Sequence, residues 1–324
     1  MNVQFLLLSD GASAKYLGIN PVRGLQNLGI NAEYYFRSRN TGVILPTPDY
    51  VFFLKPNLKD LTVGDGVQFT HTTNNSPKFV LIVNDQRLPI ESEMVYDFFV
   101  SPSLDWQREY IKRHPNKPCY LINEEIDYHT TKIHKPSKEL KVVTTGYAVN
   151  LIHYFLPIVP MIKEVTKDIT VVTNGKANEL EMLENAGCKI VPFLPHYTRM
   201  LEENYDRLMV EQFMSYDVGV ITQYGNTRGS GRTSNRVKLL NCAGLPVVCT
   251  NSANHRDLWF NGEHNRNLKV VEKIDWVTHL VYLQNVKRRQ LISNFNSVAI
   301  KRCGGIIKSA KSFLEAIKQY ESLS

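Results

Sequence analysis

The chain has 324 residues, 43% of them hydrophobic and 21% charged, a composition that is typical of folded proteins and excludes a disordered chain. This length excludes a small disulfide scaffold and predicts two domains or one large one. The net charge of +7 is unevenly spread, because residues 1–128 carry 12 basic and 14 acidic side chains and residues 129–324 carry 26 and 17. The second half, at net +9, favours phosphate-bearing ligands, nucleic acid or an anionic membrane surface.

Neither a signal peptide nor a transmembrane helix is expected. The apolar run at residues 5–8 is short, follows no basic residue and meets Asp10 at once. The most apolar later stretch, residues 151–162, is interrupted by Pro157 and Pro160 and is well short of the ~20 residues that cross a bilayer. The five cysteines are odd in number, widely spaced and without a C-x-x-C pair, which favours reduced core thiols in a cytoplasmic protein.

Short apolar runs alternate with helical-period segments along the whole chain, which predicts an α/β fold. The tail over residues 275–320 reads as mostly helical, with a break at Gly304 and Gly305. Helices are predicted at residues 21–28, 104–113, 150–165, 199–213 and 234–243. Strands are predicted at residues 3–8, 50–54, 79–83, 98–101, 119–122, 141–145, 169–172, 189–191, 217–221 and 245–249.

A polar, proline-containing stretch divides these elements into two similar sets. We therefore predict an N-terminal Rossmann-like domain over residues 1–128, a linker over 129–140 and a C-terminal Rossmann-like domain over 141–324. The helical tail at about 305–324 could return to the first domain. In open α/β sheets ligands bind beyond the carboxyl ends of the strands, so the fold class predicted here, two such domains facing across a cleft, places candidate residues directly after strands.

The segment after the first strand carries small residues that could approach a phosphate or a sugar, Gly11 and Ser13 among them. It also reads as a plain strand-to-helix turn. The segment is not a G-x-G-x-x-G fingerprint and has no Walker lysine, so a nicotinamide dehydrogenase and a P-loop NTPase are disfavoured.

Residues 225–238 form the stronger candidate, because they follow the strand at 217–221 and lead into a helix. Glycines, three arginines and a capped helix N-terminus suit a diphosphate, although a solvated loop has the same composition. The candidate donor-binding residues in this segment are Arg228, Gly229, Arg232, Ser234, Asn235, Arg236 and Lys238.

Three motifs follow one another in the second half of the chain: Ser215-Tyr216-Asp217-Val218-Gly219-Val220, then Ser234-Asn235-Arg236, then Ala243-Gly244-Leu245-Pro246-Val247-Val248. Together they resemble the donor-binding domain of the GT-B glycosyltransferases. Residues 101–103 and 122–127 look like that family's last N-domain strands, and Thr144-Thr145-Gly146-Tyr147 looks like the glycine turn that opens its nucleotide-binding domain. The resemblance implies a nucleotide-sugar donor bound by residues 144–260, with Gly146, Tyr147 and Asn174 among its contacts, and an acceptor bound by the first domain.

Many retaining members of the family have two glutamates at the positions where this chain has Gly231 and Leu239. No basic residue follows the Gly146 turn, so the resemblance leaves the diphosphate to the cationic 225–238 segment. GT-B enzymes typically need no bound metal, and no metal-ligand motif is present in the sequence, so we expect no cofactor.

For an inverting reaction, a base from the first domain must deprotonate the acceptor hydroxyl. Asp85, which follows the strand at 79–83 where the family often keeps a functional histidine or acid, is the leading candidate, and Asp10 and His71 come next. Each of them could instead be a capping or turn residue.

The acceptor stays open between a glycan, a protein side chain and a hydroxylated base of nucleic acid. Residues 276–313 carry seven basic residues and no acidic one, so this segment could contact DNA phosphate or an anionic membrane, or be a solvated helical face. A non-catalytic nucleotide- or glycan-binding protein and a sugar-nucleotide epimerase of the same plan are the alternatives to a metal-independent hexosyl- or pentosyltransferase.

Overall fold

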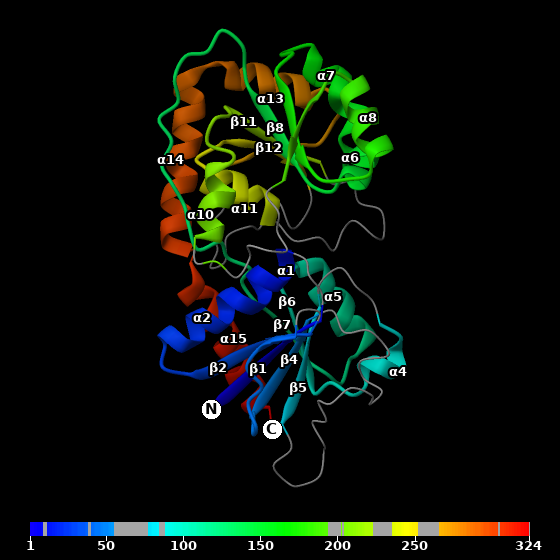
Figure 1. Cartoon of the computed structure of the whole chain (residues 1–324), viewed down its shortest axis with the longest axis vertical. Coiled ribbons are helices and arrows are strands. Elements are labelled where there is room, and N and C mark those ends of the chain that lie inside the picture. The colour runs from blue at the N-terminus through cyan, green and yellow to red at the C-terminus, as the bar shows by residue number, and fades with distance from the viewer. Residues whose placement is uncertain are drawn as a thin grey trace. The chain divides into compact units, whose positions relative to one another are not determined.

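The computed structural model describes residues 1–8, 12–37, 40–54, 77–83, 88–193, 202, 204–222, 235–251, 266–303 and 305–323. These residues form two compact units (Figure 1). Unit 1 contains Met1–Glu125 together with the C-terminal segment from Gly305, and unit 2 contains the residues between them. The tail predicted to return to the first domain thus belongs to unit 1.

Unit 1 is built on a seven-stranded sheet in the order β3-β2-β1-β4-β5-β6-β7. Only the edge strand β3 is antiparallel to its neighbour, and at the centre Phe5 pairs with Tyr34 on one side and Phe52 on the other. The strands are β1 (Asn2–Leu7), β2 (Asn31–Phe36), β3 (Thr41–Gly42), β4 (Tyr50–Leu54), β5 (Lys78–Ile82), β6 (Phe98–Ser101) and β7 (Cys119–Leu121).

The start of one helix in unit 1 is fixed by a side-chain cap. Ser103 caps α5, since its side chain accepts a hydrogen bond from the Trp106 N–H (3.4 Å), and α5 spans the predicted residues 104–113. The first helix contains a π-helical turn, η1 (Lys15–Ile19), between α1 (Ala12–Ala14) and α2 (Asn20–Asn27). The remaining described helices of this unit are α4 (Ile90–Glu93) and α15 (Ile306–Glu321).

The C-terminal helix α15 is part of the core of unit 1. It packs along α2, as Figure 1 shows, and the Phe313 ring makes edge contacts with Phe5 and Phe52, both at 5.3 Å between ring centroids. Phe313 is fully buried. Because a buried aromatic side chain contributes about 3–5 kcal/mol, the last helix is needed for a complete first unit.

Unit 2 is built on a fully parallel six-stranded sheet in the order β10-β9-β8-β11-β12-β13. Its strands are β8 (Val142–Thr145), β9 (Ile169–Thr173), β10 (Lys189–Pro192), β11 (Val218–Ile221), β12 (Val247–Thr250) and β13 (Leu268–Val270). Its described helices are α6 (Ala148–Tyr154), η3 (Leu156–Ile158), α7 (Val159–Lys163), α8 (Ala177–Asn185), α10 (Tyr205–Glu211), α11 (Asn235–Cys242), α13 (Asp275–Gln284) and α14 (Val286–Cys303).

The predicted α/β class with two parallel-sheet domains is confirmed, with local corrections. The single helix predicted at 150–165 is wrong: Pro157 lies inside a 3₁₀ turn and Pro160 opens α7, so two short helices replace one. Strands β2, β3 and β13 were not predicted. Within the residues described, no helix is both long enough and apolar enough to cross a bilayer.

Candidate functional site

The sheet of unit 2 has its topological switch point between β8 and β11. The chain leaves β8 toward β9 on one side, while β11 lies on the other side, so the connections after these two strands diverge. Such a divergence opens a crevice beyond the carboxyl ends of the two strands, where α/β proteins bind ligands. Gly146 follows β8 directly and Thr222 follows β11 directly.

An arginine lies at this switch point. Arg236, in the first turn of α11, donates a hydrogen bond from Nη1 to the Thr145 carbonyl oxygen (3.4 Å) at the end of β8. Gly146 has φ +154°, and a Cβ added there would lie 2.8 Å from Arg236 Nη1. The positive φ favours glycine at this position, and a side chain there would displace the half-buried guanidinium, which lies beside the carboxyl end of β8.

The turn after β8 is held in place from the neighbouring strand. The Gly146 carbonyl oxygen accepts a hydrogen bond from Thr173 Oγ1 (2.6 Å), and the Gly146 N–H donates to the Val172 carbonyl oxygen (3.4 Å). The Ala148 N–H donates to the Asn174 carbonyl oxygen (3.3 Å), which ties the start of α6 to the end of β9. A turn fixed in this way is preorganised for a ligand.

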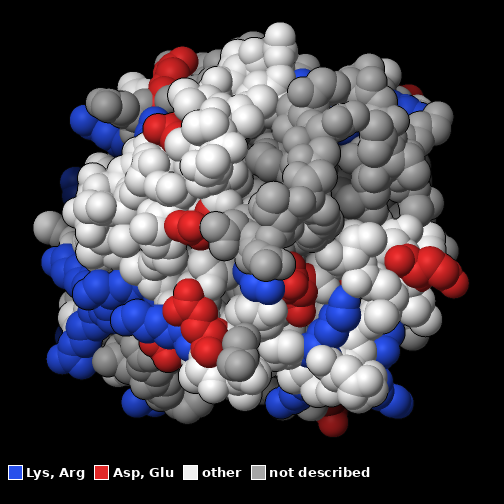
Figure 2. All heavy atoms as spheres, turned by 90° about the horizontal axis from the view of Figure 1, so that it is seen from below, with Lys and Arg blue, Asp and Glu red and all other residues white. Residues whose placement is uncertain are grey.

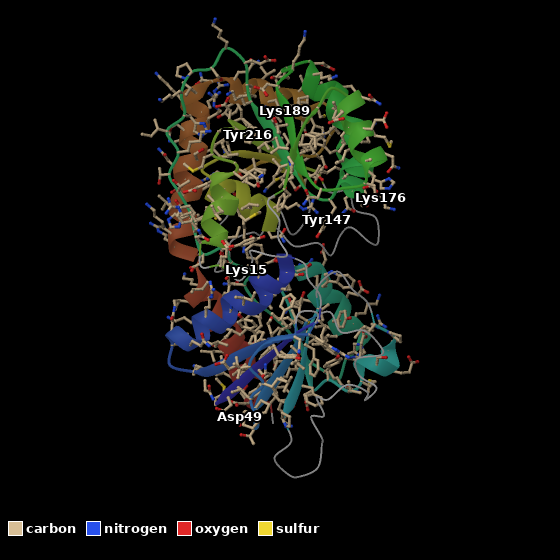
Figure 3. All side chains as sticks on the ribbon, in the orientation of Figure 1. Lys15, Asp49, Tyr147, Lys176, Lys189 and Tyr216 are labelled. Atoms are coloured by element: carbon tan, nitrogen blue, oxygen red, sulfur yellow. The ribbon has the colours of Figure 1, made fainter. Side chains whose placement is uncertain are left out.

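Two other predicted donor contacts follow strands of the same sheet. Tyr147 is half exposed (51%) and lies at the same end of unit 2 as Lys176, whereas Lys189 and Tyr216 lie toward the other end (Figure 3). Asn174 already has partners: its side chain accepts from the Phe193 N–H (3.2 Å) and donates to the Phe193 carbonyl oxygen (3.4 Å). The Asn174 amide thus links the ends of β9 and β10.

The remaining predicted donor residues divide into three groups. Asn235 begins α11 and stands next to Arg236. Lys238 and Ser13 are buried, at 2% and 7% exposure, in α11 and α1 respectively. Five predicted donor residues lie outside the described residues, namely Gly11, Arg228, Gly229, Arg232 and Ser234. Their roles stay predictions.

All three predicted catalytic residues, Asp85, Asp10 and His71, also lie outside the described residues. The described residues on both sides of Asp85 are firmly anchored, however. Before it, the Val83 carbonyl oxygen accepts from Ser101 Oγ (3.1 Å). After it, the Leu88 N–H donates to Glu93 Oε1 (3.2 Å) and the Leu88 carbonyl oxygen accepts from Arg113 Nη2 (2.8 Å).

Glu93, which holds the Leu88 N–H, is fully buried and receives three further partners. Tyr110 Oη donates to Glu93 Oε1 (2.6 Å), and His114 Nε2 and Arg113 Nε lie 2.6 Å and 3.1 Å from Glu93 Oε2. A buried carboxylate that has these hydrogen bonds and a guanidinium beside it is well compensated. The cluster therefore fixes where the connection after β5 rejoins the described chain.

Several hydroxyl groups near the switch point were missed by sequence reasoning. Thr144 and Thr145, the last residues of β8, and Thr222, directly after β11, are buried, and their hydroxyl oxygens have no hydrogen-bond partner in the described part of the chain. The signal that could have found the threonines is their position at the carboxyl end of a strand or directly after it.

Neither a nucleophilic cysteine nor a metal centre is supported by the residues that the structure describes. Burial raises the pKa of Cys119 to about 12 and that of Cys188 to about 11, so both thiols stay protonated and poorly nucleophilic. No group of three His, Cys, Asp or Glu side chains suited to a metal ion occurs within the described ranges. Metal independence stays a prediction.

The face of the molecule seen from below carries charged side chains of both signs (Figure 2). On the face seen in Figure 2, lysine and arginine side chains gather along one edge, while acidic side chains are scattered. Asp217 of the family-like motif is not part of this surface, because it is buried at the opposite end of β11 from the switch point. Its Oδ2 accepts from the Lys141 N–H (3.0 Å), so its role is structural.

The chain as a whole is similar to known proteins in structure but not in sequence. No family model and no curated protein sequence matches. Among solved structures, Anabaena HepE in complex with UDP and glucose has a TM-score of 0.63 at 11% identity, with 98% of this chain and 100% of that chain covered. The lipopolysaccharide outer core galactosyltransferase WaaB has 0.59 at 10%, with 98% and 99% covered. A glycosyltransferase from Rickettsia africae has 0.59 at 10%, with 100% and 99% covered.

These likenesses are structural, since the identities lie near one residue in ten. They extend over both units of the chain and over the whole length of each relative. The class that they define is the GT-B fold, the architecture of these glycosyltransferases, and the resemblance predicted from the motifs is confirmed for the fold.

Proposed function

We propose that the chain is a glycosyltransferase that transfers a sugar from a nucleotide-sugar donor to a hydroxyl acceptor. The single observation that carries the proposal is the position of Arg236, whose guanidinium lies beside Gly146 at the switch point of unit 2. A cation at that edge suits the diphosphate of a nucleotide sugar, because a charge-assisted hydrogen bond from arginine is strong and directional. The fold shared with the glycosyltransferases above supports the same conclusion.

In this proposal, unit 2 binds the donor. Arg236 contacts the diphosphate together with the N–H groups at the start of α11, whose dipole favours negative charge. Arg228 and Arg232 of the preceding segment add charge as the bond between the anomeric carbon and the diphosphate oxygen breaks. With these cations the leaving group needs no metal ion, and we propose a metal-independent reaction.

Unit 1 binds the acceptor. Its hydroxyl oxygen forms the new bond to the anomeric carbon, and its proton passes to a base. We propose Asp85 as that base, with Asp10 and His71 as the alternatives. The hydrogen bonds that hold Val83 and Leu88 support this choice, since a base on a connection anchored at both ends can be positioned well.

UDP-hexoses are the first donors to test, because HepE was solved with UDP and glucose. The acceptor is a glycan or a hydroxylated base of nucleic acid. A cytoplasmic location remains a prediction, supported by the four cysteines whose side chains the structure describes, all of them buried and unbridged.

The experiment is a thermal-shift panel of nucleotides combined with donor hydrolysis. A ligand that binds only the folded state raises the melting temperature, so UDP or another nucleoside diphosphate is expected to stabilise the protein. Slow hydrolysis of one nucleotide sugar, unchanged by EDTA, is expected with it. Binding without turnover on any acceptor would favour the non-catalytic alternative, and conversion of the donor sugar without its release would favour an epimerase.

A further inference from the structure

Helix α14 of unit 2 presents an apolar stripe to solvent. Leu291, Phe295 and Val298 are 68%, 41% and 49% exposed, and their spacing of four and three residues places them on one face of the helix. Scattered exposed apolar side chains are ordinary, but a continuous stripe on one helix face is not. The opposite face of α14 is buried in unit 2.

The stripe continues onto the neighbouring extended segment. Residues 128–139 run alongside α14 in Figure 1 and are joined to it, because the His134 N–H donates to Gln290 Oε1 (2.8 Å) and Gln290 Nε2 donates to the Lys132 carbonyl oxygen (2.9 Å). Between these two anchors Ile133 is 79% exposed. Four large apolar side chains on two adjoining segments thus face solvent.

Basic residues surround this stripe. The same helical spacing extends it to Arg288 at one end and Arg302 at the other, both exposed. At its centre the Arg266 guanidinium lies 4.7 Å from the centre of the Phe295 ring. Helix α14 contains no acidic residue, and the adjoining segment 128–139 contains one, Glu139 at its end. We call this surface, formed by Ile133, Arg266, Arg288, Leu291, Phe295, Val298 and Arg302, the α14 face.

We propose that the α14 face docks on an anionic membrane surface, with α14 lying in the plane of the interface. Helices that bind this way combine an apolar stripe, which enters the boundary between headgroups and acyl chains, with basic side chains that reach lipid phosphates and carboxylates. Duplex DNA would bind the arginines but would gain nothing from the exposed Leu291 and Val298, because proteins bind DNA mainly through its phosphates. The exposed apolar stripe therefore favours a membrane over DNA as the partner of this surface.

The test is flotation of the full chain with phosphatidylcholine vesicles that contain about 30 mol% phosphatidylserine, against phosphatidylcholine alone. No nucleotide sugar is added, so the result does not depend on the proposed transferase activity. Binding to the anionic vesicles that weakens as salt is raised is expected. The double variant Leu291→Ser, Phe295→Ser should reduce partitioning about tenfold or more, and Arg288→Gln with Arg302→Gln should reduce it several-fold.

The matched control is Met182→Ser on α8, a half-exposed apolar residue of the same unit outside the α14 face, which should bind like the unchanged protein. Unchanged melting temperatures show that the variants fold. Three outcomes would overturn the proposal: no binding to anionic vesicles, a duplex-DNA shift lost only in the arginine variant, or a dimer without vesicle binding that the Leu291→Ser, Phe295→Ser variant dissociates.

Discussion

Gly24 of α2 meets the backbone of Ile306 so closely that a Cβ at position 24 would lie 2.2 Å from the Ile306 carbonyl oxygen. It would also lie 2.8 Å from the Ala310 Cβ. Both neighbours belong to α15, so the absence of a side chain at this one position allows the last helix of the chain to pack on the first unit.

Gly24→Ala should therefore destabilise the protein. In an exposed helix interior this substitution stabilises by about 1 kcal/mol, whereas here the close backbone contact should reverse the sign and cost about 1–3 kcal/mol. Chemical denaturation of the variant measures the difference, with Asn27→Ala on the exposed side of α2 as the control. A gain in stability for Gly24→Ala would show that α2 and α15 do not pack as described.

The elements that could be predicted from sequence are those whose signals are local. Helix α5 has a serine cap and an apolar period, and it was predicted to the residue. Strand β2, with the sequence NAEYYF, is only half buried and mixes polar with aromatic residues, so it lacks a buried strand's apolar run. Strand β13 has three residues, which is too short for any period to show.

Only part of the candidate site could be predicted, because the rest depends on contacts between residues that are far apart in sequence. Gly146 and Arg236 were each singled out by motif, but their contact depends on the pairing of β8 with β11, in which Val218 lies opposite Val142, a residue far from it in sequence. Asp217 was read as part of a donor-binding motif, and the hydrogen bonds that define its structural role come from Ser137 and Lys141, which lie far from it in sequence.

Asp217 is also the buried partner of Arg289, with 3.8 Å between Asp217 Oδ1 and Arg289 Nη2. Asp217→Ala would leave the Arg289 guanidinium, 1% exposed, without a counter-charge, and should lower the free energy of unfolding by about 2–4 kcal/mol. Asp217→Asn, which keeps the shape, should cost less. Urea unfolding of both variants tests this, and equal stability of Asp217→Ala and the unchanged protein would exclude the pairing.

His134 should make stability depend on pH. Burial, with nearby Lys132, lowers the pKa of His134 from its ordinary value of 6.5 to about 4, so the folded protein keeps the ring neutral. The unfolded chain takes up the proton first, and stability present above pH 6.5 should fall by about 1–3 kcal/mol as the pH drops toward 4. The His134→Gln variant should lose less over this range. Parallel stability curves for the two proteins between pH 7 and 4 would contradict the assignment.

Asp85→Asn tests the proposed base. The substitution keeps the side-chain shape and removes the proton acceptor, so kcat should fall by ~10² to 10⁴ while donor affinity stays nearly constant. Steady-state rates with the donor found in the nucleotide panel provide the measurement. Near-normal kcat would remove Asp85 from the mechanism and direct attention to Asp10 and His71.

The central claim is that unit 2 binds a nucleoside diphosphate through the cation beside Gly146, and titration calorimetry with UDP tests it most directly. Arg236→Ala should weaken binding roughly tenfold to hundredfold, since a charge-assisted hydrogen bond contributes about 1.5–3 kcal/mol. Arg207→Ala is the matched control, because Arg207 is an exposed arginine of the same unit that pairs with Glu211 on α10, and it should bind UDP like the unchanged protein. Equal UDP affinity in Arg236→Ala and the unchanged protein, with the fold intact, would contradict the account.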